Sequence, residues 1–221
     1  MNLVTTLLQN RTQFVTEIRS SDDLKKRIIS LTITGAIAFG TYGFIIGLHE
    51  NILYALASMI KLPCLYLITL AICMPAFFIF DSFIGSKASM LQSMAIALTA
   101  TCIIGILLVG FAPVTLLFLI TNNNDAVFQF LNVIFFTISG LVGVRFFYYT
   151  ILSDSKEEVA LYNKRRTVVR IWMILYAFVG TQLAWTLRPF FGAASDKFVF
   201  IREIKGNFYS NLLKIISDMV Q

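Results

Sequence analysis

The sequence predicts an all-α integral membrane protein, a bundle of about five transmembrane helices with an amphipathic interfacial helix at each end. Of its 221 residues, 57% are hydrophobic and only 14% are charged, which is too apolar for a water-soluble domain. Its apolar runs are continuous over roughly 20 residues, the length of a helical span, and lack the alternation of a barrel strand. Because these runs use most of the chain, no soluble catalytic domain is expected.

Three regions are expected along the chain. Residues 1–27 carry Leu3, Val4 and Leu7 on one helical face, which indicates an amphipathic segment at the cytoplasmic interface. The polar run from Ser20 to Asp23 offers an N-cap for a helix that begins near Leu24. Residues 28–192 form the transmembrane bundle, and residues 193–221 form an amphipathic tail.

The hydropathy pattern places the five spans at about 28–48, 61–80, 90–111, 126–150 and 168–187. Ile52 to Ile60 is too short to cross a membrane, so it is expected at the interface, with Pro63 in the first turn of the second span. Pro75 predicts a kink in that span, and Pro113 predicts a bent apolar extension after the third span. His49 to Asn51 is expected as a turn on the outer side.

Basic residues predict the orientation, because cytoplasmic loops are enriched in Lys and Arg. The Leu24–Arg27 segment and the charged stretch from Ser153 to Thr167 both favour a cytoplasmic amino end, in the inner membrane of a cell. Five spans then leave Arg188 and Lys197 outside, against the same rule. Four or six spans, with the carboxyl end inside, are the alternative.

Small residues recur at helical spacing along the first span and predict a helix-packing seam. The seam consists of Thr32, Gly40, Gly43 and Gly47, in which Gly43 and Gly47 form a GxxxG pair. Such a pair lets two helix backbones approach closely.

Two further sets of residues are candidates for function. Thr181 and Gln182, followed by Arg188, are polar side chains at the end of the fifth span, where lipid offers them no partner. They either pack against other helices and anchor the span at the interface, or line a pore or vestibule. A basic cluster is expected to bind anionic headgroups or an acidic cytosolic ligand such as a nucleotide or oligonucleotide, or to act only as a topogenic signal. Its members are Lys25, Lys26, Arg27, Lys164, Arg165 and Arg166.

Catalytic chemistry is not expected. The chain has a single histidine, His49, and no phosphate-binding loop or metal-ligand motif, so no enzyme activity, cofactor or metal is predicted. Cys64, Cys73 and Cys102 fall within apolar runs and are expected to behave as small hydrophobes. No span is expected to carry a charged residue near its middle, which argues against a proton-coupled transporter.

Two resemblances are present. Leu24-Lys25-Lys26-Arg27 resembles the LKKT/V core of actin-binding WASP-homology-2 modules, from which it departs at Arg27; because the chain enters the membrane at once, actin binding is not expected. The plan of five spans with a cytoplasmic amino end is similar in architecture to the Yip1-like membrane proteins, although their sequence motifs are not found. That resemblance implies a non-conducting scaffold that binds lipid or partner proteins.

The sequence favours a gated ion-conducting pore formed by a homo-oligomer, as in small bacterial channel effectors of defence. It does so by elimination, since mid-span charges for coupled transport and catalytic groups are both missing. The alternative is the Yip1-like scaffold.

Overall fold

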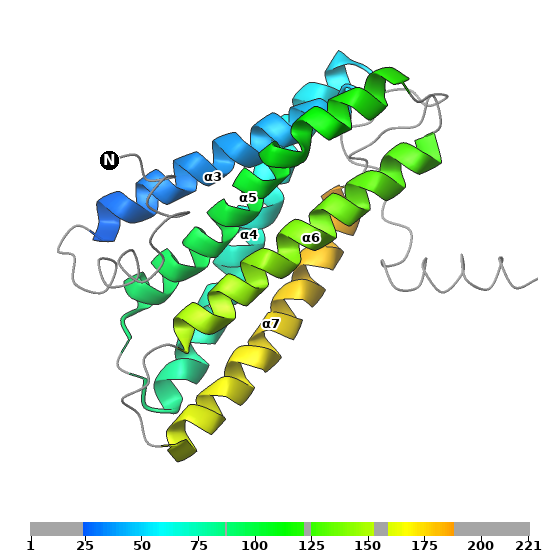
Figure 1. Cartoon of the computed structure of the whole chain (residues 1–221). Helices are drawn as coiled ribbons and strands as arrows, with labels where there is room; N and C mark the ends of the chain where they lie inside the picture. The colour runs from blue at the N-terminus through cyan, green and yellow to red at the C-terminus, as the bar shows by residue number, and fades with distance from the viewer. Residues whose placement is uncertain (1–23, 87, 122–124, 153–158, 188–221) are drawn as a thin grey trace, which may run out of the picture.

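The computed structural model describes residues 24–86, 88–121, 125–152 and 159–187, and these form five long α-helices (Figure 1). They are α3 (Leu24–Gly47), α4 (Ile52–Phe83), α5 (Met90–Thr121), α6 (Asp125–Ile151) and α7 (Val159–Leu187). Each is long and apolar enough to cross a membrane, so the chain is a multi-pass membrane protein and the predicted fold class is confirmed. The amphipathic helices expected at the two ends of the chain lie outside the described residues.

The structure corrects the prediction for the second span. Ile52 to Ile60 is not a separate interfacial piece, because α4 runs unbroken through Pro63 and Pro75. The helix starts at Asn51, whose side chain accepts hydrogen bonds from the backbone N–H groups of Leu53 and Tyr54 at 2.9 and 3.1 Å. Membrane helices tolerate internal prolines because neighbouring groups compensate the lost hydrogen bond.

Two other boundaries differ from the prediction. The helix α5 continues through Pro113 to Thr121, so the expected bent extension is part of the same helix. The helix α7 begins at Val159 rather than near Val168, and much of the expected charged loop is therefore its first turns.

The helices pack in a definite order. The helix α3 packs against both α4 and α5, α6 packs against α5, and α7 packs against α4. The backbones of α6 and α7 approach each other at few points. Side chains therefore make most of the contact along the α6–α7 edge.

Two groups of buried side chains follow one another along the bundle. One lies where α3, α5 and α7 begin and α4 and α6 end, and includes Leu31, Phe77, Ala95, Phe147 and Trp172. We call this the basic end, because Lys25, Lys26, Lys164 and Arg166 also lie there. The other group, at the far end, includes Phe39, Tyr42, Leu62, Leu108 and Phe135.

Three glycines of the predicted seam lie against the backbone of α4. A Cβ atom on Gly43 would meet the carbonyl oxygen of Ser58, and one on Gly40 would lie 3.3 Å from the carbonyl oxygen of Met59. A Cβ atom on Gly47 would come within 2.6 Å of the Cα atom of Ala55. Thr32, the fourth member, is half-buried and donates to the carbonyl of Ile28 in its own helix at 2.8 Å. The contact between α3 and α4 thus depends on the absence of side chains.

Candidate functional site

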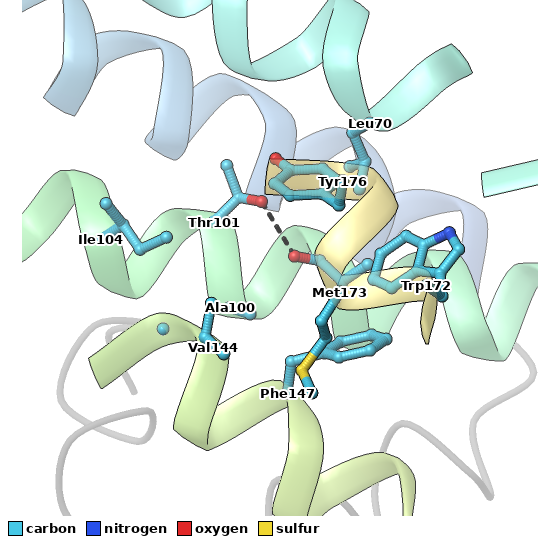
Figure 2. Close-up of a pocket in the computed structure, with 11 residues that line it drawn as sticks. Leu70, Ala100, Thr101, Ile104, Val144, Phe147, Trp172, Met173 and Tyr176 are labelled. Carbon is cyan, nitrogen blue, oxygen red and sulfur yellow. Dashed lines mark hydrogen bonds between the residues drawn. The ribbon is translucent and has the colours of Figure 1, made fainter. Parts of the chain in front are cut away.

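A small, partly open cavity of about 40 Å³, with room for a few water molecules, lies between α4, α5, α6 and α7 (Figure 2). It takes shape because α5 presents the small side chains of Ala97 and Ala100 to the interior. Gly143 brings α6 close to α5, since a Cβ atom there would meet the side chain of Ile104 and lie 3.1 Å from the carbonyl oxygen of Ala100. The cavity is therefore set by small residues on α5 and α6.

The wall of the cavity is mainly apolar, with two hydroxyl-bearing side chains. The Thr101 hydroxyl donates to the carbonyl of Ala97 in its own helix at 3.0 Å, and the Tyr176 side chain lines the same cavity from α7. Figure 2 shows Tyr176 beside Leu70, and Thr101 on the side toward Ile104. Such a wall suits apolar groups, or water and ions that need only brief hydrogen bonds.

A layer of aromatic rings closes the cavity toward the basic end. The ring centroids of Phe77, Phe147 and Trp172, from α4, α6 and α7, are 4.9 to 5.7 Å apart. The indole N–H of Trp172 donates to the backbone carbonyl of Cys73 at 2.8 Å. This hydrogen bond holds the layer in place and ties α7 to α4.

A buried ion pair lies beyond the aromatic layer. Arg165 Nε donates to Asp81 Oδ1 at 2.8 Å and Arg165 Nη2 donates to Asp81 Oδ2 at 3.1 Å. Each side chain is only 3% exposed. The two-pronged geometry is the strong form of this interaction, and it joins the end of α4 to the start of α7.

The end of α4 has a defined geometry that positions Asp81. Gly85 adopts φ +97°, the left-handed conformation that glycine accepts readily. Its N–H bonds to the carbonyl of Ser82 at 3.0 Å, and the N–H of Ser86 bonds to the carbonyl of Asp81 at 3.2 Å. This is a Schellman termination, which stops the helix just after Asp81.

The ion pair corrects the prediction for Arg165. This residue is not part of an exposed basic cluster, because it is buried against Asp81, which belongs to the last turn of α4. Lys164 and Arg166 are exposed, as are Lys25 and Lys26 on α3, whereas Arg27 is half-buried. The α3 and α7 halves of the predicted cluster share the basic end, but these two helices are not among the closely packed pairs.

A buried polar network crosses the far end. The Tyr42 hydroxyl donates to Asn132 Oδ1 at 2.6 Å and lies 3.3 Å from the Thr115 hydroxyl. The Asn132 amide in turn donates to the carbonyl of Phe128 at 2.8 Å. The network therefore links α3, α5 and α6.

Replacing Tyr42 with phenylalanine should lower the stability of the bundle by roughly 1–2 kcal/mol, because Asn132 loses its interhelical donor in an apolar interior. Thermal unfolding in detergent measures the effect. Thr41→Val is the matched control, since the neighbouring Thr41 hydroxyl is exposed and donates only within α3, to the carbonyl of Ile37 at 2.9 Å. Equal unfolding temperatures for the two variants would contradict the role of the network.

Lys61 also departs from the prediction that charged residues occur only at span ends. Because α4 begins at Ile52, Lys61 lies within the helix, and it is 2% exposed. The argument against mid-span charges therefore does not hold for α4.

The predicted pore residues lie apart from the cavity. Thr181 and Gln182 are half-buried near the far end of α7 and do not line it. The Thr181 hydroxyl donates to the backbone carbonyl of Phe178 at 2.8 Å, and the backbone carbonyl of Gln182 accepts from the Thr186 hydroxyl at 2.9 Å. Arg188 lies outside the described residues.

No family model, curated protein or solved structure matches this chain. The resemblance to Yip1-like proteins stays a prediction. Among the described residues, no group of three or more His, Cys, Asp or Glu side chains is placed to hold a metal ion. The assignment of a function rests on the interior of the bundle.

Proposed function

We propose that the protein is a gated ion-conducting membrane protein whose path runs through the interior of each copy, between α4, α5, α6 and α7, and is closed in the conformation described. The carrying observation is a succession of layers along the interior. From the basic end these are the Asp81–Arg165 pair, the aromatic layer, and the cavity with Thr101.

Two buried hydroxyls add support. Ser93 on α5 and Ser139 on α6 are buried, and neither hydroxyl has a hydrogen-bond partner among the described residues. A hydroxyl without a partner in an apolar interior is unfavourable and requires an explanation. Neither lines the cavity, but each lies one helical turn from a residue that does, Ala97 or Gly143, so water entering an open path there would supply the missing partner.

The outer faces of the helices favour an interior path over one formed between copies. Exposed side chains along α3 include Ile29, Ile33 and Ile37, and those along α7 include Ile171 and Ile174. Such faces suit lipid or another protein surface rather than water. A homo-oligomer, which we retain as part of the proposal, would then carry one path in each copy.

The closed layers suggest how a gate would work. Rings such as Phe77 and Trp172 exclude water from a narrow passage, and ions do not cross a dry constriction. On the basic-end side of these rings, the ion pair between Arg165 and Asp81 holds α7 against α4. Since the backbone of α7 packs against α4 and approaches α6 at few points, α7 is the helix that would move away when the path opens.

Planar-bilayer recording on purified protein tests the proposal. We expect ionic currents that fall when the cavity hydroxyls are removed in Thr101→Val and Tyr176→Phe, because permeating ions lose polar contacts there. Thr137→Val is the control, since Thr137 is exposed on α6 and its hydroxyl donates only to Val133 in the same helix. Currents equally changed by all three substitutions would exclude the cavity as the path.

The Yip1-like scaffold is the competing function. The interior contacts would then serve only to fasten the helices, as interhelical hydrogen bonds do in many membrane bundles. A wild-type protein without current in every lipid and at every voltage, together with an ion-pair variant that is folded and also silent, would favour the scaffold.

A further inference from the structure

Basic and aromatic side chains gather on the outer side of α6 and α7 at the basic end. Arg166 Nε donates to the Tyr148 hydroxyl at 2.8 Å, and the Arg170 guanidinium lies 6.0 Å from the centre of the Tyr148 ring. The Arg145 guanidinium lies 5.5 Å from the centre of the Tyr149 ring. All three arginines are exposed, so their charge is available to an external anion.

The same edge of the bundle leads to the cavity. Val144, next to Arg145, and Met173, one turn from Arg170, both line the cavity from α6 and α7. The backbones of these two helices approach each other at few points, and both helices line the cavity, which is partly open. An apolar recess therefore lies directly beside a cluster of three positive charges.

We propose that this edge binds one anionic phospholipid, with its phosphate held by Arg145, Arg166 and Arg170 and one acyl chain lying between α6 and α7 into the cavity. Guanidinium groups bind phosphate oxygens in two-pronged fashion, and tyrosines favour the headgroup level of a membrane. The proposal does not depend on ion conduction.

The position of the three arginines beside an apolar recess favours a phospholipid over a soluble anion. Inorganic phosphate or a nucleotide would occupy the arginines but leave the apolar recess empty. A molecule that reaches both parts needs a phosphate and a hydrocarbon chain, and the surrounding bilayer supplies it. The acyl chain also fills a recess whose wall is mostly apolar.

Fluorescence quenching by brominated lipids tests the site, because Trp172 lines the cavity and bromine quenches an indole only at short range. The protein with Trp185→Phe, which keeps a single tryptophan, is placed in nanodiscs of neutral phosphatidylcholine. Phosphatidylglycerol with a brominated chain is then titrated in. We expect stronger quenching than with brominated phosphatidylcholine at the same mole fraction, and equal quenching by the two lipids would overturn the proposal.

Charge variants locate the headgroup. Arg166→Gln and Arg170→Gln should each weaken the binding of the anionic lipid about fivefold, which is the effect expected for one basic residue at a membrane surface. Lys164→Gln is the matched control, because it removes the same charge from an exposed position on the same helix. An equal loss with all three variants would indicate a general surface potential and contradict a specific site.

A second pair of variants locates the acyl chain. Val144→Phe should obstruct the recess and reduce quenching of Trp172, whereas Val142→Phe should not, although Val142 and Val144 are 43% and 42% exposed on the same helix. Soluble glycerol phosphate is added as a competitor. Full displacement of the lipid signal by millimolar glycerol phosphate, or no difference between the two valine variants, would show that the arginines hold a free anion and overturn the lipid assignment.

Discussion

Replacing Gly43 with leucine is expected to abolish the folded bundle. A Cβ atom at this position would meet the carbonyl oxygen of Ser58 and lie 2.9 Å from its carbonyl carbon. Overpacking a core ordinarily destabilises by about 1–3 kcal/mol when side chains can move aside. Here the obstacle is the backbone of α4, so α3 and α4 must separate and the loss should exceed that range.

Size-exclusion chromatography in mild detergent measures the outcome, and we expect aggregation or loss of expression for Gly43→Leu. Gly110→Leu is the matched control, because Gly110 is exposed on α5 and a Cβ atom there would meet nothing within 4 Å. The control should elute like the wild type. Wild-type elution and unfolding temperature for Gly43→Leu would disprove the close approach of the two helices.

The sequence was sufficient for the number and type of the helices, because a continuous apolar run of span length has few alternatives in a membrane. The predicted helix boundaries were wrong near prolines. Pro63 was taken as the start of a helix that in fact begins at Ile52, since proline is unfavourable inside soluble helices. Asn51, whose side chain caps α4, was the residue in the sequence that indicated a helix start at Ile52.

The contacts between helices were harder to predict from the sequence. Spacing alone identified the glycines of α3, but not that α4 lies against them, because periodicity describes one helix at a time. The ion pair was missed for the same reason, since Asp81 and Arg165 are 84 residues apart in the sequence. Successive residues of a helix point about 100° apart, so Arg165 faces the interior while Lys164 and Arg166 face outward.

The cavity and the α6–α7 edge could not be predicted from the sequence. Thr101 and Tyr176 are ordinary members of apolar runs, and only the packing of four helices brings them together. The polar residues that stood out in the sequence, Thr181 and Gln182, lie nearer the far end of α7. Whether these residues or those around the cavity serve the function stays a prediction.

The second large effect is expected at the ion pair. Arg165→Met leaves the Asp81 carboxylate buried without its partner, and Asp81→Leu does the same to the guanidinium. Removing one member of a buried pair typically destabilises by about 3–5 kcal/mol, whereas replacing both members with apolar residues is often neutral. Thermal unfolding of the wild type, the two single variants and the double variant forms a cycle, and we expect the double variant to recover most of the loss.

The double variant Asp81→Leu/Arg165→Met then tests whether the ion pair keeps an ion path closed or only holds α7 against α4. It is expected to be folded, but α7 is no longer tied to α4 at the basic end, and only the aromatic layer around Trp172 still closes the cavity. If the pair holds a path shut, vesicles with this variant should pass ions several times faster than vesicles with equal amounts of wild-type protein. Lys164→Met, which removes an exposed charge from the same helix, should leave the flux unchanged. A double variant that unfolds like the wild type and passes no more ions than Lys164→Met would leave Asp81 and Arg165 as a structural pair and remove the gate from the proposed function.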